Sequence, residues 1–169
     1  PWVYDMIAAG CATFYKVQDG KKWYYDIPSK GYKIIPGQEA YLYLQPLRGS
    51  KTVWSNSGCN VIDIGDDVLC CEFHTKMNTI GGEVIQGMNI AIETAEKDFR
   101  GLVIANEGQN FSAGANLAMV FMPAIEQEYD EIDMAIRAFQ NMNMRVRYSS
   151  IPVVVAPHAL TLGGGCEMS

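Results

Sequence analysis

The chain has few of the residues that metal and redox sites require. It contains two histidines and five cysteines in 169 residues, and no two cysteines have the CxxC spacing of zinc or dithiol sites. His74 and His158 lack the HxxE and HExxH patterns, so no metal centre is expected. Five cysteines, an odd number without regular spacing, argue against a disulfide framework and are typical of reduced thiols.

Positive charge and long apolar runs are also scarce. The 13 Lys and Arg residues are outnumbered by 19 Asp and Glu residues, for a formal net charge of -6. No cationic cluster stands out, and nucleic acid is therefore not an expected partner. No apolar run approaches the roughly 20 residues that span a bilayer, and a signal-peptide pattern is absent from the first residues. We expect a soluble cytoplasmic protein without a membrane span.

The first 56 residues differ in composition from the rest of the chain. They are rich in aromatic residues, glycine and proline, and the polar stretch 49–58 is typical of a linker. The segment Trp2–Tyr15 predicts one short helix, which Gly10 weakens. We therefore expect a mostly helical or irregular region over residues 1–56 and a separate domain over residues 57–169.

Residues 57–169 alternate between strand and helix patterns. Short apolar runs predict strands at Val61–Ile64, Val68–Phe73, Gly101–Asn106 and Pro152–Ala156. Helical spacing of apolar residues predicts long helices over Gly81–Lys97 and about Tyr129–Tyr148. In the second helix the residues expected to point inward are Ile132, Ile136, Phe139, Met142 and Val146. The order strand, strand, helix, strand, helix, strand indicates an α/β fold.

Two glycine-centred turns, Phe111–Asn116 and Leu162–Glu167, are the most informative feature of the chain. Each is expected to follow a strand, and backbone N–H groups at such turns lack partners and can be directed at an anion. Two such donors at one oxygen would stabilise the enolate of a thioester. Glu167 follows the second turn, so one turn of helix would bring its carboxylate over the same pocket as an acid/base.

Each of these features also has a purely structural explanation. Glycine turns before helices are common for packing reasons, and Glu167 could merely complement the helix dipole. Cys166 beside a glycine turn suggests a cysteine hydrolase, but no orienting acid is identifiable. The run Gly163–Gly165 lacks the GxGxxG and GxxxxGKS/T patterns of nucleotide loops. The two turns together, in this order, favour a catalytic function.

The sequence resembles the enoyl-CoA hydratase (crotonase) superfamily in blocks that follow the usual order of that family. The blocks are His74–Ile80, Gly101–Ile104, Phe111–Leu117, Ile151–Ala156 and Gly163–Glu167. The resemblance covers about residues 60–169 and implies a crotonase-like fold of repeated β-β-α units that acts on a CoA thioester. No cofactor is then expected in this chain itself.

The same resemblance implies roles for particular residues. It assigns the oxyanion donors to the N–H groups of Ala115 and Gly164, and it matches Glu167 to the first of the two glutamates of the hydratases. The backbone around Ala113 would line the site of the CoA adenine. Lys76, beside the family-like Met77 and Asn78, could meet the CoA phosphates.

Residues 1–56 are similar to the carboxyl end of the dehydrogenase part in bacterial proteins that fuse 3-hydroxyacyl-CoA dehydrogenase to the hydratase. The similar segments are Pro1–Val3, Phe14–Tyr15 and Tyr24–Asp26. The resemblance implies an enzyme of fatty-acid β-oxidation that hydrates 2-enoyl-CoA to 3-hydroxyacyl-CoA. NAD is then expected as the cofactor of a dehydrogenase upstream of this chain.

In the family, the second glutamate and the helices that complete the pocket and the oligomer come after the GGGCE turn, and therefore after Ser169. We thus expect a fragment, truncated within the crotonase-like domain, that by itself hydrates enoyl-CoA poorly or not at all. The complete protein is expected to form a homo-oligomer. The alternatives are an enoyl-CoA isomerase, an acyl-CoA thioester hydrolase, and a non-catalytic half-domain that binds acyl-CoA.

Overall fold

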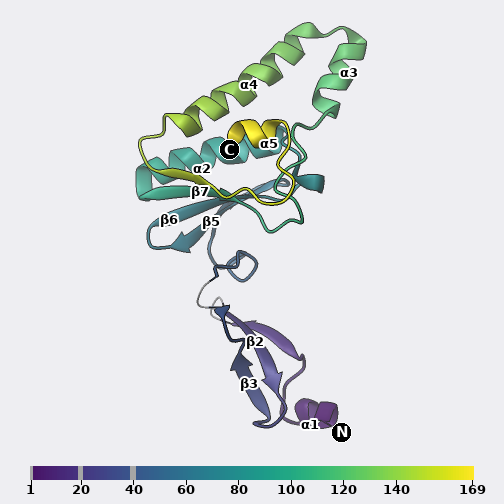
Figure 1. Cartoon of the computed structure of the whole chain (residues 1–169), viewed down its shortest axis with the longest axis vertical. Helices are drawn as coiled ribbons and strands as arrows, with labels where there is room; N and C mark the ends of the chain where they lie inside the picture. Colours follow the sequence, from purple (N-terminus) through teal and green to yellow (C-terminus); the bar gives the residue numbers. More distant parts are fainter. Residues whose placement is uncertain (1, 19–20, 39–40) are drawn as a thin grey trace. The chain divides into compact units, whose positions relative to one another are not determined.

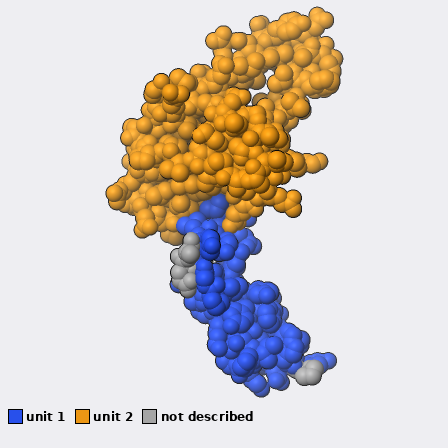
Figure 2. Space-filling view, in the orientation of Figure 1, with its two compact units in different colours: residues 1–48 blue, residues 49–169 orange. Residues whose placement is uncertain are grey.

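The computed structural model describes residues 2–18, 21–38 and 41–169. The chain divides into two compact units, one up to Arg48 and one from Gly49 onward (Figure 2). The stretch 49–58 is not the expected linker, because Thr52–Ser55 forms strand β4 and pairs with β5 (Cys59–Gly65) in the second unit. The alternating exposure of β4 turns Trp54 onto the core, which fixes this short polar segment as a strand.

The first unit contains a short helix and a small antiparallel sheet, so the expectation of a mostly helical or irregular region is wrong. Helix α1 spans Trp2–Ala8 and ends before Gly10, which has a φ of 74°. Strands β1 (Tyr15–Gln18), β2 (Lys21–Asp26) and β3 (Gly31–Ile34) pair in the order β1-β2-β3. The aromatic residues explain the difference, because Tyr and Trp favour strands and pack across them.

Aromatic and charged pairs hold this small sheet together. Tyr25 of β2 is buried and faces Tyr32 of β3, with ring centroids 6.1 Å apart. At the β2–β3 turn Lys33 Nζ lies 2.6 Å from the Asp26 carboxylate, which also accepts a hydrogen bond from Ser29 N–H at 3.1 Å. These bonds, above all the one from Lys33, lower the pKa of Asp26 to about 2.

The second unit contains a mixed sheet with the strand order β4-β5-β6-β7-β8 (Figure 1). Strands β6 (Val68–Phe73), β7 (Gly101–Ala105) and β8 (Val153–Val155) are parallel to one another, whereas β4, β5 and β6 are antiparallel. Asp66 and Asp67, between β5 and β6, have φ values of 53° and 59°, as a tight hairpin turn requires. The predicted strands are confirmed, and β5 is longer than expected.

Helices connect the strands of this sheet. The 3-10 helix η2 (Lys76–Asn78) and α2 (Gly82–Asp98) join β6 to β7, α3 (Ala118–Glu126) and α4 (Tyr129–Arg147) join β7 to β8, and α5 (Gly164–Met168) follows β8. Figure 1 shows α2 along the sheet and α4 on the far side of α2. The predicted helices correspond to α2 and α4. Helix α3 was not expected, because its sequence has no polar face before Glu126.

The core of the second unit lies between α2 and one face of the sheet. The face that α2 buries consists of Val84, Gly87, Met88, Ala91, Ile92 and Ala95. The sheet contributes Leu69, Cys71, Phe73, Leu102 and Ile104 to the same cluster. At Gly87 the helix approaches β5 closely, because a Cβ atom there would lie 2.6 Å from Cys59 Cβ. The contact therefore requires glycine.

Helix α4 forms an outer layer, and the expected set of inward residues is only partly confirmed. Of the residues of α4, Met142 alone is buried. Phe139 and Val146 pack partly against the core, whereas Ile136 is 47% exposed. The C-terminal half of α4 covers α2, whereas its N-terminal half diverges from the core toward α3. The side chains around Ile136 are therefore free to line a pocket.

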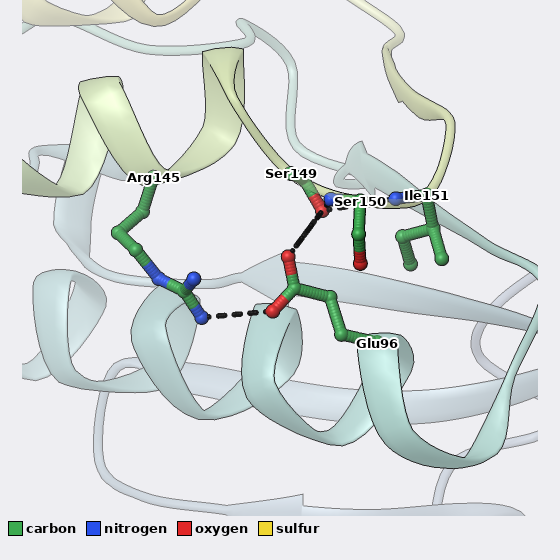
Figure 3. Close-up of polar contacts among 5 residues, drawn as sticks. All are labelled: Glu96, Arg145, Ser149, Ser150 and Ile151. Atoms are coloured by element: carbon green, nitrogen blue, oxygen red, sulfur yellow. Dashed lines mark hydrogen bonds and ion pairs between the residues drawn. The ribbon is translucent and has the colours of Figure 1, made fainter.

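A carboxylate on α2 holds the C-terminal end of α4. Glu96 accepts hydrogen bonds from Ser150 N–H (3.0 Å), Ser149 Oγ (2.9 Å) and Arg145 Nη2 (3.0 Å) (Figure 3). These bonds, with that of Ser150 the strongest influence, lower the pKa of the Glu96 carboxyl. Because Ser149 and Ser150 precede β8, the network fixes where the chain leaves α4 and enters the sheet.

Candidate active site

The first glycine turn, residues 111–116, lies beside Ile80. Ile80 N–H donates to Gly114 O and Asn116 N–H donates to Ile80 O, both at 2.9 Å, so Ile80 and Ala115 form a parallel bridge. In this bonding pattern the residue between the two bonded neighbours turns its own N–H and C=O to the opposite side. The N–H group of Ala115 therefore points away from Ile80.

The second glycine turn packs against the first. Leu162 N–H donates to Ser112 O at 2.9 Å, which aligns the approach to the second turn with the first. Gly114 has a φ of 96°, and a Cβ atom there would lie 3.0 Å from Leu162 O and 3.5 Å from Gly164 N. Both the dihedral angle and the space therefore require glycine at position 114, and Gly164 N lies next to the first turn.

A pocket of about 260 Å³ opens where the two turns meet. The three residues that the sequence predicts to be catalytic, Ala115, Gly164 and Glu167, all line it. The larger apolar side chains in its wall are Ile80, Ile85, Met119, Val120, Ile136 and Phe139. The structure thus brings two backbone turns and one carboxylate to the same cavity, with an apolar surface beside them.

Glu167 lies in the first turn of α5. Its N–H donates to Gly163 O at 3.0 Å, which closes the helical turn that follows the glycines. The residue is exposed and lines the pocket. A carboxylate in this position can exchange protons with water or with a ligand in the pocket.

The two residues that the sequence predicts as CoA contacts, Lys76 and Ala113, do not line this pocket. Ala113 N–H donates to Met77 O at 3.1 Å, which joins the first turn to the 3-10 helix that carries Lys76. Lys76 is exposed and Ala113 is half-buried. The structure therefore brings these two residues to one edge of the site, and their roles stay predictions.

The pocket also has walls that the sequence did not reveal. A Cβ atom on Gly164 would lie 3.0 Å from Phe139 Cζ, so the Phe139 ring, which also packs partly against the core, rests against the second turn. Met119 and Val120 come from α3, which was not predicted. One signal was present in the sequence, because the uncharged apolar run 117–125 directly follows the first turn.

Within residues 2–18, 21–38 and 41–169, no group of three or more His, Cys, Asp or Glu residues is arranged to hold a metal ion. No helix in the described part of the chain has both the length and the apolar character that crossing a membrane requires.

Known proteins share both the sequence and the architecture of this chain. The sequence profile of the enoyl-CoA hydratase/isomerase family matches residues 64–169. A protein of Bacillus subtilis named as a probable 3-hydroxyacyl-CoA dehydrogenase is 42% identical over 98% of this chain and 21% of its own length. A protein of Rickettsia prowazekii named as a trifunctional enzyme of a fatty acid oxidation complex is 29% identical over 84% of this chain and 20% of its own length.

A solved structure supports the fold. The crystal structure of an enoyl-CoA hydratase/isomerase from Xanthobacter autotrophicus Py2 matches with a TM-score of 0.59 and 20% identity. The match covers 68% of this chain and 43% of that chain, which shows a crotonase-like α/β fold over part of the molecule. The chain spans about a fifth of the length of each of the two relatives from Bacillus subtilis and Rickettsia prowazekii.

Proposed function

Because the chain belongs to the enoyl-CoA hydratase/isomerase family, we propose that residues 57–169 contribute an acyl-CoA site that hydrates 2-enoyl-CoA to 3-hydroxyacyl-CoA. One observation carries the proposal: the turns of Ala115 and Gly164 and the carboxylate of Glu167 line a single pocket. Backbone N–H groups in fixed positions stabilise a developing oxyanion strongly, because they need not reorganise during the reaction.

In the proposed reaction the thioester oxygen accepts hydrogen bonds from the N–H groups of Ala115 and Gly164. The oxygen of water bonds to C3 of the substrate, the double bond between C2 and C3 is lost, and the electron pair moves onto the thioester oxygen as an enolate. The attacking water gives up one of its two protons and keeps the other in the new hydroxyl group. The electron pair of the enolate then takes up a proton at C2, which restores the thioester carbonyl. Glu167 carries out one of these proton transfers, and the family resemblance assigns the other to a second glutamate.

The remaining predicted contacts belong to the CoA part of the substrate. We assign the backbone near Ala113 to the adenine and the Lys76 ammonium to a phosphate, because both lie at one edge of the site. An exposed lysine can follow a phosphate as a flexible point charge. The apolar wall formed by α3 and α4 would then take the acyl chain.

The relatives suggest a larger context. Two of them are named for 3-hydroxyacyl-CoA dehydrogenase and for a fatty acid oxidation complex, and this chain matches only about a fifth of each. We propose that the chain is part of a multifunctional enzyme of fatty-acid oxidation, with residues 1–56 belonging to the dehydrogenase region. NAD would serve the dehydrogenase, and the complete protein would be a cytoplasmic homo-oligomer.

The experiment that tests this function uses Glu167→Gln. Hydration of crotonyl-CoA by the complete polypeptide should fall by about 10²–10⁴-fold in kcat, because a general acid/base contributes that much, while the Kd for crotonyl-CoA should change little. Glu93→Gln, an exposed carboxylate on α2 outside the pocket, is the matched control and should keep full turnover. Equal activity of the two variants would contradict the role of Glu167.

The products distinguish the alternatives. Migration of the double bond in place of hydration would indicate an isomerase, and release of free CoA would indicate a thioester hydrolase. Binding of acyl-CoA without turnover by the complete polypeptide would indicate a binding module. For the 169-residue chain alone, we expect binding with little or no hydration.

A further inference from the structure

Ser112, at the start of the first glycine turn, is fully buried with both hydrogen-bonding capacities of its hydroxyl in use. Its Oγ donates to Asn78 O at 2.7 Å and accepts a hydrogen bond from Gly114 N–H at 3.0 Å. Gly114 directly precedes Ala115, so the bond from its N–H to Ser112 fixes the peptide chain just before the first proposed donor. The hydroxyl therefore acts on the geometry of that donor.

The backbone of Ser112 is bonded to the segment that leads into the second turn. Ser112 N–H donates to Leu160 O at 3.1 Å, and Leu162 N–H donates to Ser112 O at 2.9 Å. These two bonds hold residues 160–162 parallel to the first turn, immediately before the glycines that carry the second proposed donor.

The side chain of Ser112 also touches the second turn itself. A Cβ atom on Gly165 would lie 2.6 Å from Ser112 Cβ and 3.0 Å from its Oγ, so the backbone of α5 rests directly on this side chain. Ser112 thus contacts both turns: its hydroxyl holds the first, and its backbone and Cβ support the second.

The acceptor of the Ser112 hydroxyl is itself held firmly. Asn78 has a φ of 50°, an uncommon conformation for a residue other than glycine, which only the surrounding structure can maintain. The Asn78 side-chain amide donates to Asn106 Oδ1 at 3.0 Å and to Asn110 O at 2.9 Å. The Asn78 backbone oxygen that accepts from Ser112 is therefore held in place. The Ser112 hydroxyl has one orientation in which it donates to this oxygen and accepts the hydrogen bond from Gly114 N–H.

From these contacts we propose that Ser112 is a positioning residue that sets the placement of the Ala115 and Gly164 N–H groups relative to one another. The inference rests on the proposed function. Ser112 is separate from the pocket wall and acts through the backbone it holds. A hydrogen bond weakens steeply when its donor is misaligned, so loss of Oγ should affect a ligand that places negative charge on the two donors more than a ligand without such charge.

The test compares two probes on the 169-residue chain. Acetoacetyl-CoA is a 1,3-dicarbonyl thioester that can bind as an enolate, whereas CoA itself has no thioester oxygen. For Ser112→Ala we expect the preference for acetoacetyl-CoA over CoA, measured as the ratio of their Kd values, to fall about tenfold or more, because small misplacements at a reacting centre have effects of that size. The Kd for CoA should stay nearly unchanged.

Ser149→Ala is the matched control. It also removes a serine hydroxyl that makes a hydrogen bond, at 2.9 Å to Glu96, but it lies at the end of α4 away from both turns. We expect this variant to keep the wild-type ratio. A general loss of stability would affect the two variants alike, so a change confined to Ser112→Ala supports the positioning role.

The outcomes separate the inference from the proposed function. If the wild-type chain prefers acetoacetyl-CoA and folded Ser112→Ala keeps the same preference, the positioning role is wrong while the acyl-CoA site stands. If the wild-type chain binds neither probe, the proposed function fails and the inference fails with it. Should Ser112→Ala not fold, Ser112→Cys keeps a weaker hydrogen-bonding group in place and should give an intermediate ratio. A wild-type ratio in that variant would also overturn the inference.

Discussion

At the scale of single residues, Gly87 allows α2 to approach β5. A Cβ atom at this position would lie 2.6 Å from Cys59 Cβ and Sγ, whereas a Cβ on Gly82 of the same helix would meet nothing within 4 Å. We predict that Gly87→Ala lowers the free energy of unfolding by about 1–3 kcal/mol, because overpacking outweighs the gain in helix propensity. Urea unfolding followed by circular dichroism measures the effect.

Gly82→Ala is the control for this prediction. The same change at this open position should leave the free energy of unfolding unaltered or raise it by up to ~1 kcal/mol, because alanine favours the helix. Equal midpoints for the two variants would show that α2 and β5 do not depend on the close contact at Gly87.

The cysteines differ in the reactivity that their surroundings allow. Burial raises the pKa of the Cys70 thiol to about 12, and a hydrogen bond with Cys59 together with burial raises the pKa of Cys71. Cys166 is exposed. Because the thiolate is the reactive form, we predict that iodoacetamide modifies Cys166 in the folded chain and reaches Cys70 and Cys71 only after unfolding. Mass spectrometry of proteolytic digests measures the labelling of each cysteine. Labelling of Cys70 as fast as that of Cys166 would contradict the prediction.

At the scale of elements, Glu96 connects α2 to the end of α4. A carboxyl group whose pKa is lowered on folding stabilises the fold above its unfolded pKa, and this contribution is lost as the pH falls through the folded value. We predict that Glu96→Gln destabilises the chain at neutral pH and that its difference from wild type shrinks once the pH falls below 4.5, the ordinary value for this carboxyl.

Urea unfolding at a series of pH values tests this prediction. Glu93→Gln changes an exposed carboxylate on the same helix and should match wild type at every pH. A deficit of Glu96→Gln that stays constant from neutral to acid pH would mean that the hydrogen bonds of Glu96 do not depend on its charge.

At the scale of the whole molecule, the chain has two compact units, and each has its own set of buried residues. Among the described residues of the first unit, the buried apolar ones are Met6, Tyr25 and Leu44, whereas the second unit has a large cluster between α2 and the sheet. Smaller units bury a smaller fraction of their surface. We therefore predict two unfolding transitions in urea, with the first unit unfolding at the lower concentration.

Tryptophan fluorescence can assign the transitions. Trp23 lies in the first unit and Trp54 in the second, where it packs against the core. In Trp54→Phe the fluorescence change should follow the first transition alone, while circular dichroism should still report both. A single transition with the same midpoint by both methods would contradict independent unfolding of the units.

The sequence alone was sufficient where the structural signal is local. Helix α2 shows a 3.6-residue apolar period along its whole length, and β6 is a short run of apolar residues, so both were predicted close to their observed bounds. Glycine reveals a tight turn because few other residues adopt its backbone angles. For that reason the two turns and Glu167 could be singled out, and the family resemblance then assigned the donor roles to Ala115 and Gly164.

Tertiary structure decided the features that depend on contacts between distant segments. Strand β4 has only four residues within a mostly polar stretch, so it is recognised only when it pairs with β5. The walls that Phe139 and Met119 give the pocket depend on how α3 and α4 pack in the fold. Ser112 is an ordinary serine in the sequence, because its importance lies in simultaneous contacts with segments 34 and more residues away. Local propensity carries no information about such contacts, since they form only when the whole chain packs.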